Sequence, residues 1–419
     1  MGDADAIREQ RCDHPNPVVI SAEYALQATN LVQINDDGVK AAARYIASHL
    51  ASASYTPRTW RTHPLHLLPP EPYDPHDPAT RRVLDWLFVV ASLNFSFWSD
   101  RDDQERYGVE WREGWDAGGK GEGEGEKVVH TGYWSLVAAL DRAIEEGIPI
   151  TEPAFYASPE RCPDAIIEHV FRPARECGEK SIPLLKERIA ILREVGRTLC
   201  EDFDGSYQNF INAYQEREQG QGTALGLVNM VVNTFPSFRD ECLYEGHKIH
   251  FWKRAQILVA ETWAAFYPPP PPSPSSQYSP FPAPSNPNPH PLFPGPAGPR
   301  IRDLTMFADY RVPQIMAHLR ILSYPDSLTH LLKRGELVPH GSREEVSLRS
   351  GSIVGVERVK EEIVRIREDM GEDGEEVSSV LIDFYLWDLA KRIEQGEDRI
   401  EGIDTTPIGH AHRTRSVWY

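Results

Sequence analysis

The sequence contains little that would suit an oxidising compartment or a membrane. Its five cysteines are scattered, odd in number, and never spaced as C-x-x-C, so neither a disulfide framework nor a zinc site is predicted. No run of about 18 apolar residues occurs. The polar stretch over residues 1–17 has no apolar segment of the kind found in signal peptides. We therefore expect a reduced, cytoplasmic protein with no membrane span and a disordered N-terminus over residues 1–17.

Basic charge is also scarce. The 44 Lys and Arg residues face 63 Asp and Glu residues, which gives a formal net charge of -19 and an acidic pI near 5.3. Broad binding to a DNA or RNA backbone needs a basic surface, so this balance argues against a direct nucleic-acid partner. A small anionic ligand held by a few local cations remains compatible with it. The sequence carries no signal for an oligomeric state.

Several catalytic motifs are missing as well. The chain has no G-x-S-x-G, no H-E-x-x-H and no dinucleotide fingerprint, and we expect neither a metal nor a cofactor. Gly114 to Lys120 matches the first seven positions of a phosphate-binding P-loop. Gly121 then stands where Ser or Thr is required, so we interpret the match as accidental.

Two segments have compositions that cannot form a core. Residues 114–126 are a Gly/Glu low-complexity stretch, and residues 268–300 hold fifteen of the 35 prolines. Because both are flanked by strongly patterned sequence, we interpret them as solvated loops inserted into one fold. The chain of 419 residues is then predicted to form a single domain over residues 18–419.

The remaining sequence is mainly helical in pattern. Apolar residues recur at helical spacing around residues 136–144, 185–199, 315–321, 356–366 and 379–392. Ser158-Pro159 resembles a helix cap followed by a first-turn proline. Strand signals are fewer: residues 107–111 and 127–130 predict a hairpin, and residues 248–252 a further strand. The predicted class is mainly α with a small antiparallel β-sheet.

The helix predicted at residues 379–392 is apolar on nearly all sides but contains Asp383 and Asp388. A helix of this kind is usually buried, and a buried carboxylate needs a cation, hydrogen-bond donors or a ligand. At helical pitch the two aspartates lie roughly 140° apart, so both could border one pocket only from its two sides. The alternative is a structural salt bridge from each aspartate to a basic residue.

Asp309 poses a similar question in the segment Thr305–Arg311. It follows an apolar stretch and precedes a helix that Pro313 opens. One interpretation is a carboxylate that caps this helix. The other is a catalytic carboxylate on a rigid loop, which could stabilise an oxocarbenium-like centre, attack it, or activate water.

Aromatic clusters at residues 94–100 and 132–135 could contact a planar heterocycle, although most aromatic residues in such positions simply form core. Two basic pairs stand out because cations are few: His247-Lys248 and Lys253-Arg254, which flank the predicted strand. They could receive a phosphate, and surface solvation is the alternative.

Taken together and in order, the conspicuous segments resemble those of the queuosine salvage proteins, which are queuosine 5′-phosphate N-glycosylases. The resemblance runs from about Val18 to Tyr419, apart from the two insertions. The matching segments are Phe95–Trp98, Thr131–Leu136, Glu146–Thr151, Phe235–Asp240, Lys253–Ala260, Thr305–Arg311 and Tyr385–Asp388.

The resemblance implies a mostly helical fold similar to that of DNA glycosylases and a set of site residues. Asp309 occupies the position of the catalytic carboxylate. The positions that contact the base are occupied by His66 (with His63 as the alternative), Phe307, Asp383, Phe384 and Asp388. Related sequences often carry Tyr at the position of Phe384. His247 and Lys248 match a basic pair for the phosphate, with His247 in place of the usual Lys.

The chemistry of these residues agrees with that substrate. Queuine, a 7-deazaguanine with a secondary ammonium on its side chain, offers donors that carboxylates accept. Breaking an N-ribosidic bond builds positive charge on the sugar, which Asp309 would oppose. The sequence therefore predicts a metal-independent hydrolase that releases queuine from queuosine 5′-monophosphate. The alternatives are a non-catalytic queuine- or queuosine-binding protein and a nucleic-acid glycosylase.

Overall fold

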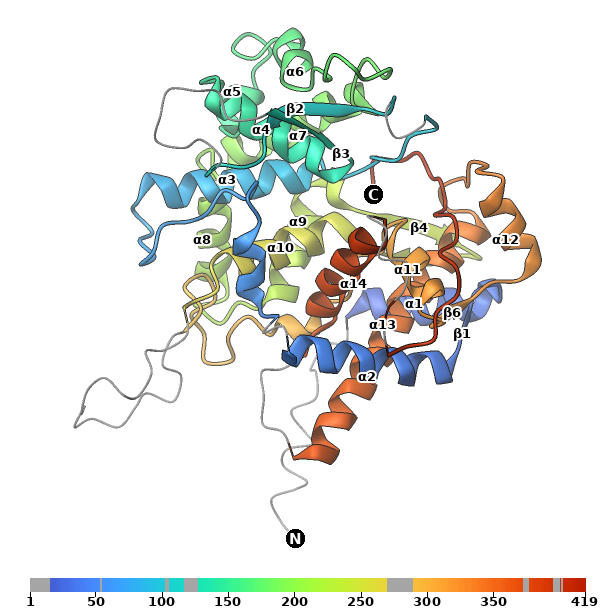
Figure 1. Ribbon diagram of the computed structural model, residues 1–419. Helices are drawn as coiled ribbons and strands as arrows, with labels where there is room; N and C mark the ends of the chain where they lie inside the picture. The colour runs from blue at the N-terminus through green and yellow to red at the C-terminus, as the bar shows by residue number, and fades with distance from the viewer. Residues whose placement is uncertain are drawn as a thin grey trace, which may run out of the picture. The chain divides into compact units, whose positions relative to one another are not determined.

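The computed structural model (Figure 1) describes residues 16–52, 55–101, 105–116, 127–269, 289–371, 377–394, 400 and 402–419. The chain forms two compact units, each assembled from three separate stretches. Unit 1 consists of the described parts of Met1–Ser48, Glu241–Phe251 and Arg302–His412. Unit 2 consists of the described parts of His49–Asp240, Trp252–Ile301 and Arg413–Tyr419.

The prediction of a mainly α class with little antiparallel sheet is confirmed. In the described residues the strands form three separate two-stranded antiparallel pairs rather than one sheet. The strands are β1 (Gln33–Ile34), β2 (Gly108–Arg112), β3 (Lys127–Thr131), β4 (Glu241–Tyr244), β5 (His247–His250) and β6 (Leu322–Ser323). They pair as β1 with β6, β2 with β3, and β4 with β5.

Unit 1 is organised around the long helix α13. Its side chains are buried over most of the first half, and α1 packs along it. Both helices begin with a side-chain cap: Asn16 accepts the N–H of Val18, and Ser342 accepts the N–H of Glu345. The helices of this unit are α1 (Pro17–Thr29), α2 (Asp36–Ser52, of which the last residues belong to unit 2), α11 (Val312–His318), α12 (Asp326–Lys333), α13 (Arg343–Met370) and α14 (Ser379–Glu394), with the 3₁₀ turn η3 (Ile301–Asp303) at its edge.

Three of these helices, α11, α13 and α14, pack against one another (Figure 1). Gly355 of α13 permits the close approach to α11, because a Cβ atom there would lie 2.5 Å from the Cε atom of Met316. The segment that enters α11, residues 305–311, is bonded to both other helices, through Arg349 of α13 and Asp383 of α14. This is the place in unit 1 where the sequence predicted the catalytic carboxylate.

Unit 2 is built around α10, in which all thirteen side chains are buried. Helices α3 and α9 and the turn η1 pack on it. Its elements are η1 (Pro57–Thr62), α3 (Pro78–Ser92), α4 (Tyr133–Glu145), α5 (Pro153–Tyr156), α6 (Asp164–Val170), α7 (Leu185–Asp202), α8 (Tyr207–Arg217), α9 (Ala224–Thr234), η2 (Pro236–Phe238), α10 (Lys253–Ala265) and the hairpin β2–β3.

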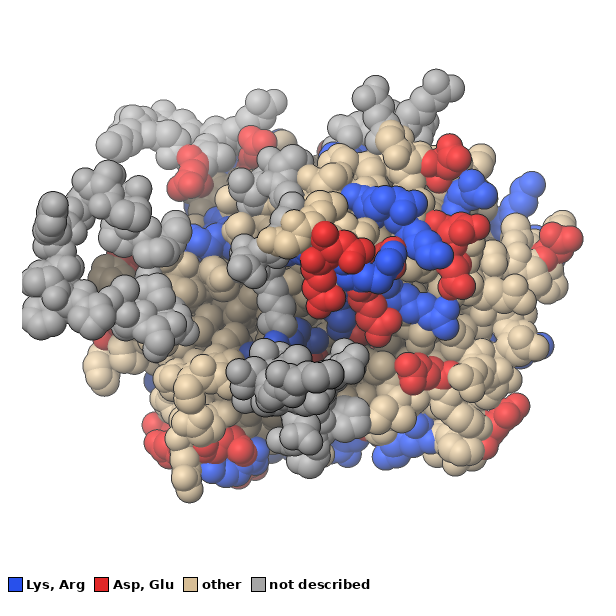
Figure 2. Space-filling model, turned by 90° about the horizontal axis from the view of Figure 1, so that it is seen from below, with Lys and Arg blue, Asp and Glu red and all other residues tan. Residues whose placement is uncertain are grey.

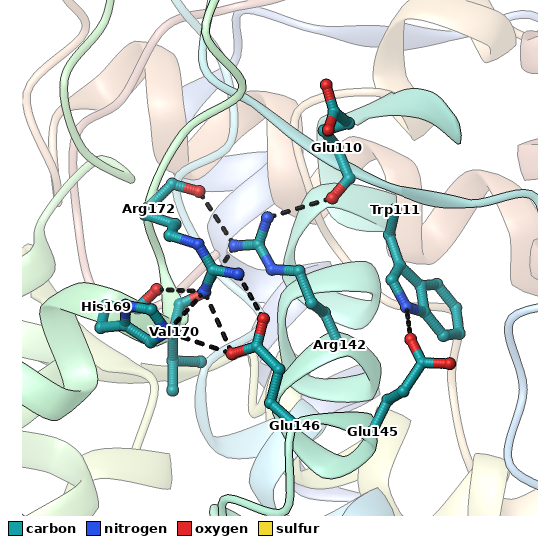
Figure 3. A network of polar contacts seen from close by, with 8 residues as sticks. All are labelled: Glu110, Trp111, Arg142, Glu145, Glu146, His169, Val170 and Arg172. Carbon is teal, nitrogen blue, oxygen red and sulfur yellow. Dashed lines mark hydrogen bonds and ion pairs between the residues drawn. The ribbon is translucent and has the colours of Figure 1, made fainter. Parts of the chain in front are cut away.

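Arg142 of α4 ties the β2–β3 hairpin of unit 2 to the segment after α6 (Figure 3). Its guanidinium donates to the carbonyl oxygens of Glu110, Val170 and Arg172, each at 3.0 Å. Glu146, at the end of the same helix, pairs with Arg172 and lies 3.1 Å from Nε2 of His169. The Arg142 contacts thus join backbone carbonyl oxygens of β2, of the last residue of α6 and of the segment that follows it.

Several predicted boundaries shift in the structure. The helices expected around residues 136–144, 185–199, 356–366 and 379–392 and the hairpin at residues 107–130 are confirmed as α4, α7, α13, α14 and β2–β3. The expected helix start at Ser158-Pro159 is wrong: these residues lie in turns, and α6 begins at Asp164. The strand predicted for residues 248–252 ends at His250, since Trp252 takes a left-handed conformation with φ of 49°.

The predicted insertions fall partly outside the described residues, namely at 117–126 and 270–288, as does the N-terminal segment 1–15. At the far end of the proline-rich segment, His290, Leu292 and Phe293 are buried in unit 2. The amide of Gln215 also donates to the carbonyl oxygen of Leu292 at 2.8 Å. This end of the segment is therefore packed rather than solvated. Likewise, Asn16 and Pro17 already belong to the capped start of α1.

Charged side chains of both signs are interspersed on the face drawn in Figure 2, and no broad basic surface is seen there. In unit 1, an ion pair between oppositely charged side chains links two helices: Arg358 of α13 lies 3.3 Å from Asp36 of α2. Among the described residues, no helix combines the length and the apolar character that crossing a membrane requires.

Candidate active site

The segment Thr305–Ala308, directly before Asp309, has no regular secondary structure but is fully buried. Buried backbone outside helices and strands must find other hydrogen-bond partners. Two side chains from neighbouring helices of unit 1 supply them. Asp383 of α14 accepts the N–H of Phe307 at 3.0 Å, and Nε of Arg349 of α13 donates to the carbonyl oxygen of Ala308 at 2.9 Å.

Asp309 itself is half-buried and uses one carboxylate oxygen to cap α11. Its Oδ1 atom accepts the backbone N–H groups of Arg311 at 2.8 Å and Val312 at 2.9 Å. In the part of the chain that the structure describes, no further hydrogen bond reaches this carboxylate. The N-cap position of α11 is Arg311, and Asp309 acts from two residues earlier, where Oδ1 satisfies two N–H groups at the helix start. The same two bonds orient Oδ2.

Asp383 is 4% exposed, and the partner described above is a backbone N–H rather than a basic side chain. The sequence offered a salt bridge as the structural alternative for this aspartate. The backbone contact gives it a different structural task, which is to fix the peptide that precedes Phe307. Asp388 lies five residues further along α14 and is half-buried.

The two phenylalanines of the predicted base site lie together. The ring centroids of Phe307 and Phe384 are 6.0 Å apart, at an interplanar angle of 54°. Phe307 is 5% exposed and Phe384 is half-buried. Unit 1 thus brings together Phe307, Asp309, Asp383 and Phe384 through contacts on the loop 305–309 and on α14.

The predicted phosphate residues lie elsewhere in unit 1, on the exposed β4–β5 hairpin. Lys248 is 57% exposed and pairs with Glu241 at 3.0 Å, and the His247 ring lies 4.0 Å from the ring of Tyr24. Among the described residues, no hydrogen bond, ion pair or ring contact joins His247 or Lys248 to the Asp309 loop. Their assignment to a phosphate stays a prediction.

His66 belongs to unit 2, where it sits among aromatic rings. Its ring stacks on Trp60 with centroids 4.0 Å apart, and its Nδ1 atom lies 2.6 Å from the Trp60 carbonyl oxygen. Burial lowers the pKa of His66 to about 3, so the ring is neutral at physiological pH. Nδ1 must then carry the proton shared with the carbonyl, which leaves Nε2 as a hydrogen-bond acceptor.

His63, the alternative to His66, stacks on Trp134 with ring centroids 3.5 Å apart. It is half-buried, and its Nδ1 atom accepts the N–H of Leu65 at 3.3 Å. Both histidines belong to one aromatic cluster of unit 2, since their rings are 5.0 Å apart.

Arg349 is a residue of this region that the sequence interpretation did not single out. It is fully buried on α13, its guanidinium stacks 3.9 Å from the Phe251 ring, and it pairs with Glu345 at 3.4 Å. Burial alone would raise the pKa of Glu345, but His340, Arg349 and the Gly341 N–H outweigh it and lower this pKa to about 2. The available signal was the Glu345/Arg349 spacing of four residues among small and apolar neighbours.

Within the described residues, no group of three or more His, Cys, Asp or Glu side chains is arranged to hold a metal ion. The loop 305–309 instead presents a carboxylate beside aromatic rings and a second carboxylate. Such an arrangement can oppose positive charge that develops on a sugar and can accept hydrogen bonds from a heterocycle.

The structure is that of a mainly helical protein in which carboxylates and aromatic rings gather on the loop 305–309 and on α14. Comparison with known proteins then identifies the family. A family model described as Queuosine salvage protein matches residues 73–277 and 290–419. The chain belongs to the queuosine salvage protein family.

Full-length relatives agree with this assignment. The chain is 36% identical over 411 residues to the queuosine 5′-phosphate N-glycosylase/hydrolase of Schizosaccharomyces pombe, covering 96% of this chain and 99% of that protein. It is 34% identical to the protein of the same name from Mus musculus, covering 95% and 97%. It is 32% identical to that from Sphaerobacter thermophilus, covering 96% and 97%.

Proposed function

We propose that this protein hydrolyses the N-glycosidic bond of queuosine 5′-monophosphate and releases queuine for salvage into tRNA. In this reaction the bond between C1′ and the base nitrogen breaks. The water oxygen bonds to C1′ as a hydroxyl group, and the released base takes up a proton. The observation that carries the proposal is the Asp309 carboxylate, held by one oxygen on a buried loop within a family of this activity.

Asp309 is proposed to stabilise the positive charge that develops on the ribose. Because the N–H groups of Arg311 and Val312 hold Oδ1, the side chain cannot rotate away, and Oδ2 is the oxygen available to the sugar or to water. A carboxylate fixed in this way needs no reorganisation as the charge appears, which is the general source of electrostatic catalysis.

The base is proposed to bind through Phe307, Phe384, Asp383 and Asp388. The aromatic rings give a planar heterocycle surfaces to contact, and the carboxylates accept from its N–H donors or complement its ammonium group. Asp383 also accepts the N–H of Phe307 through Oδ1, so the proposed base contact and the loop share one carboxylate. A neutral His66 would accept a hydrogen bond through Nε2 rather than donate one.

The remaining assignments stay predictions. These are the phosphate contacts of His247 and Lys248, the cytoplasmic location, the single catalytic domain over residues 18–419 and the likeness to DNA glycosylases. Lys248 pairs with Glu241, and the three N–H donors of its ammonium group would allow a phosphate contact beside this pair.

The proposal is tested by replacing Asp309 with Asn and measuring queuine release from purified nucleotide by chromatography. Asn keeps an oxygen that can accept from Arg311 and Val312, so the cap of α11 is retained while the charge is lost. We expect turnover to fall by about 10²–10³-fold. Asp326→Asn, at an exposed acid in the first turn of α12, is the matched control and should retain turnover.

Two results would contradict the proposal. Undiminished turnover by the Asp309→Asn protein would remove the role given to this carboxylate. Binding of queuosine 5′-monophosphate by the wild-type protein without any queuine release in a single turnover would identify a binding protein instead of a hydrolase.

A further inference from the structure

The buried arginine of α13, Arg349, is bonded to the peptide that precedes Asp309. Its Nε atom donates to the carbonyl oxygen of Ala308 at 2.9 Å. That carbonyl and the N–H of Asp309 belong to one planar peptide unit. Fixing the carbonyl oxygen of Ala308 therefore fixes the plane of this peptide, and with it the direction of the N–Cα bond of Asp309.

Asp309 is thus constrained from both sides along the chain. On the preceding side Arg349 orients the peptide, and on the following side the N–H groups of Arg311 and Val312 hold Oδ1. The bond from Asp383 to the N–H of Phe307 acts two peptides earlier, on the Met306–Phe307 peptide. The two anchors therefore divide the loop, because Asp383 holds the side of Phe307 and Arg349 holds the side of Asp309.

Arg349 is itself held rigidly, which a positioning group requires. Its guanidinium lies over the Phe251 ring at 3.9 Å and pairs with Glu345 at 3.4 Å. Glu345 is anchored in turn by the N–H of Gly341 at 2.6 Å, and Nδ1 of His340 lies 3.1 Å from Oε1. Arg349 and Glu345 are both fully buried, so this ion pair does not exchange with water as a surface pair does.

We infer that Arg349 is a positioning residue for the hydrolysis, acting through the Ala308–Asp309 peptide to aim the free oxygen of Asp309. The inference rests on the proposed function. Loss of the Arg349 contact should therefore lower the rate of bond cleavage without lowering the affinity for the base, because Asp383 anchors Phe307 separately. A misplacement of the carboxylate by about 1 Å is enough to lower the rate by roughly 10²-fold.

The test compares Arg349→Lys with Arg142→Lys. Arg142 is the matched control, because it is also a buried arginine that donates to backbone carbonyl oxygens, but in unit 2. Each protein is measured for single-turnover queuine release, for queuine affinity by calorimetry, and for amide hydrogen exchange over residues 305–312. We expect Arg349→Lys to slow release by about 10–100-fold with queuine affinity changed less than about threefold. It should also accelerate exchange in the loop, and Arg142→Lys should do neither.

Release within about threefold of wild type, or a loss of rate matched by an equal loss of queuine affinity, would overturn the positioning role. If Arg349→Lys does not fold, Glu345→Gln provides the same comparison with a smaller expected loss of rate, and unchanged release by that variant overturns the role equally. Absence of queuine release by the wild-type protein would instead refute the proposed function. The exchange measurement then still decides whether Arg349 holds the loop.

Discussion

At the scale of single residues, Asp383 combines two tasks that substitution can separate. Its Oδ1 atom accepts the N–H of Phe307, and its negative charge is proposed to bind the base. Asn in this position keeps an acceptor for the N–H group but removes the charge. Ala removes both and leaves a buried N–H without its partner, which costs about 1–3 kcal/mol of stability.

We therefore predict that Asp383→Asn lowers queuine affinity by roughly tenfold, the difference between a charged and a neutral acceptor, and leaves the free energy of unfolding nearly unchanged. Asp383→Ala should lower both the affinity and the free energy of unfolding. Calorimetry with queuine and urea unfolding measure the two effects separately. Equal unfolding free energies for the Asn and Ala proteins would show that the contact to Phe307 does not stabilise the loop.

At the scale of helices, a buried carboxylate connects α3 to α8 in unit 2. Asp85 of α3 accepts the N–H of Tyr207, the first residue of α8, at 2.8 Å, and lies 3.5 Å from Arg81. Burial raises the pKa of Asp85 from 3.8 to about 7, despite the opposing effects of Tyr207 and Arg81. The folded protein therefore binds a proton at Asp85 that the unfolded chain releases, between about pH 4 and pH 7.

The sign of this linkage makes the folded state less stable as pH rises through that window. Asn in place of Asp85 behaves like the protonated acid and still accepts from Tyr207. We predict that the Asp85→Asn protein has a higher free energy of unfolding than wild type, by a margin that grows by about 2.5 kcal/mol between pH 5 and pH 8. Urea unfolding at the two pH values measures the margin. Burial also raises the pKa of Glu261, but this contribution is present in both proteins and cancels in the comparison. A margin that stays constant or shrinks would contradict the assignment.

At the scale of the whole molecule, the sequence predicted what depends on local pattern. Helices α4, α7, α13 and α14 and the β2–β3 hairpin follow from periodicity, and the carboxylates of the site stood out as acids in apolar surroundings. It did not predict how the irregular loops are held. Arg142, Arg188 and Arg349 satisfy carbonyl oxygens 28, 93 and 41 residues away, and no spacing rule connects such partners. The link from Arg349 to the site was invisible for that reason.

The net charge of -19 leads to a last prediction, which concerns the form of the substrate. The face shown in Figure 2 mixes basic and acidic side chains, and a polyanion the size of tRNA gains affinity only where cations displace its counterions. We predict that queuosine within intact tRNA is neither hydrolysed nor an inhibitor of nucleotide turnover at physiological salt. Competition assays with purified tRNA measure this, and free queuine, which should inhibit as a product, shows that the assay detects occupancy of the site. If tRNA does inhibit, and if this inhibition weakens steeply with added salt, the protein has a basic surface that binds tRNA. That result would favour a nucleic-acid glycosylase over an enzyme that acts on free nucleotides.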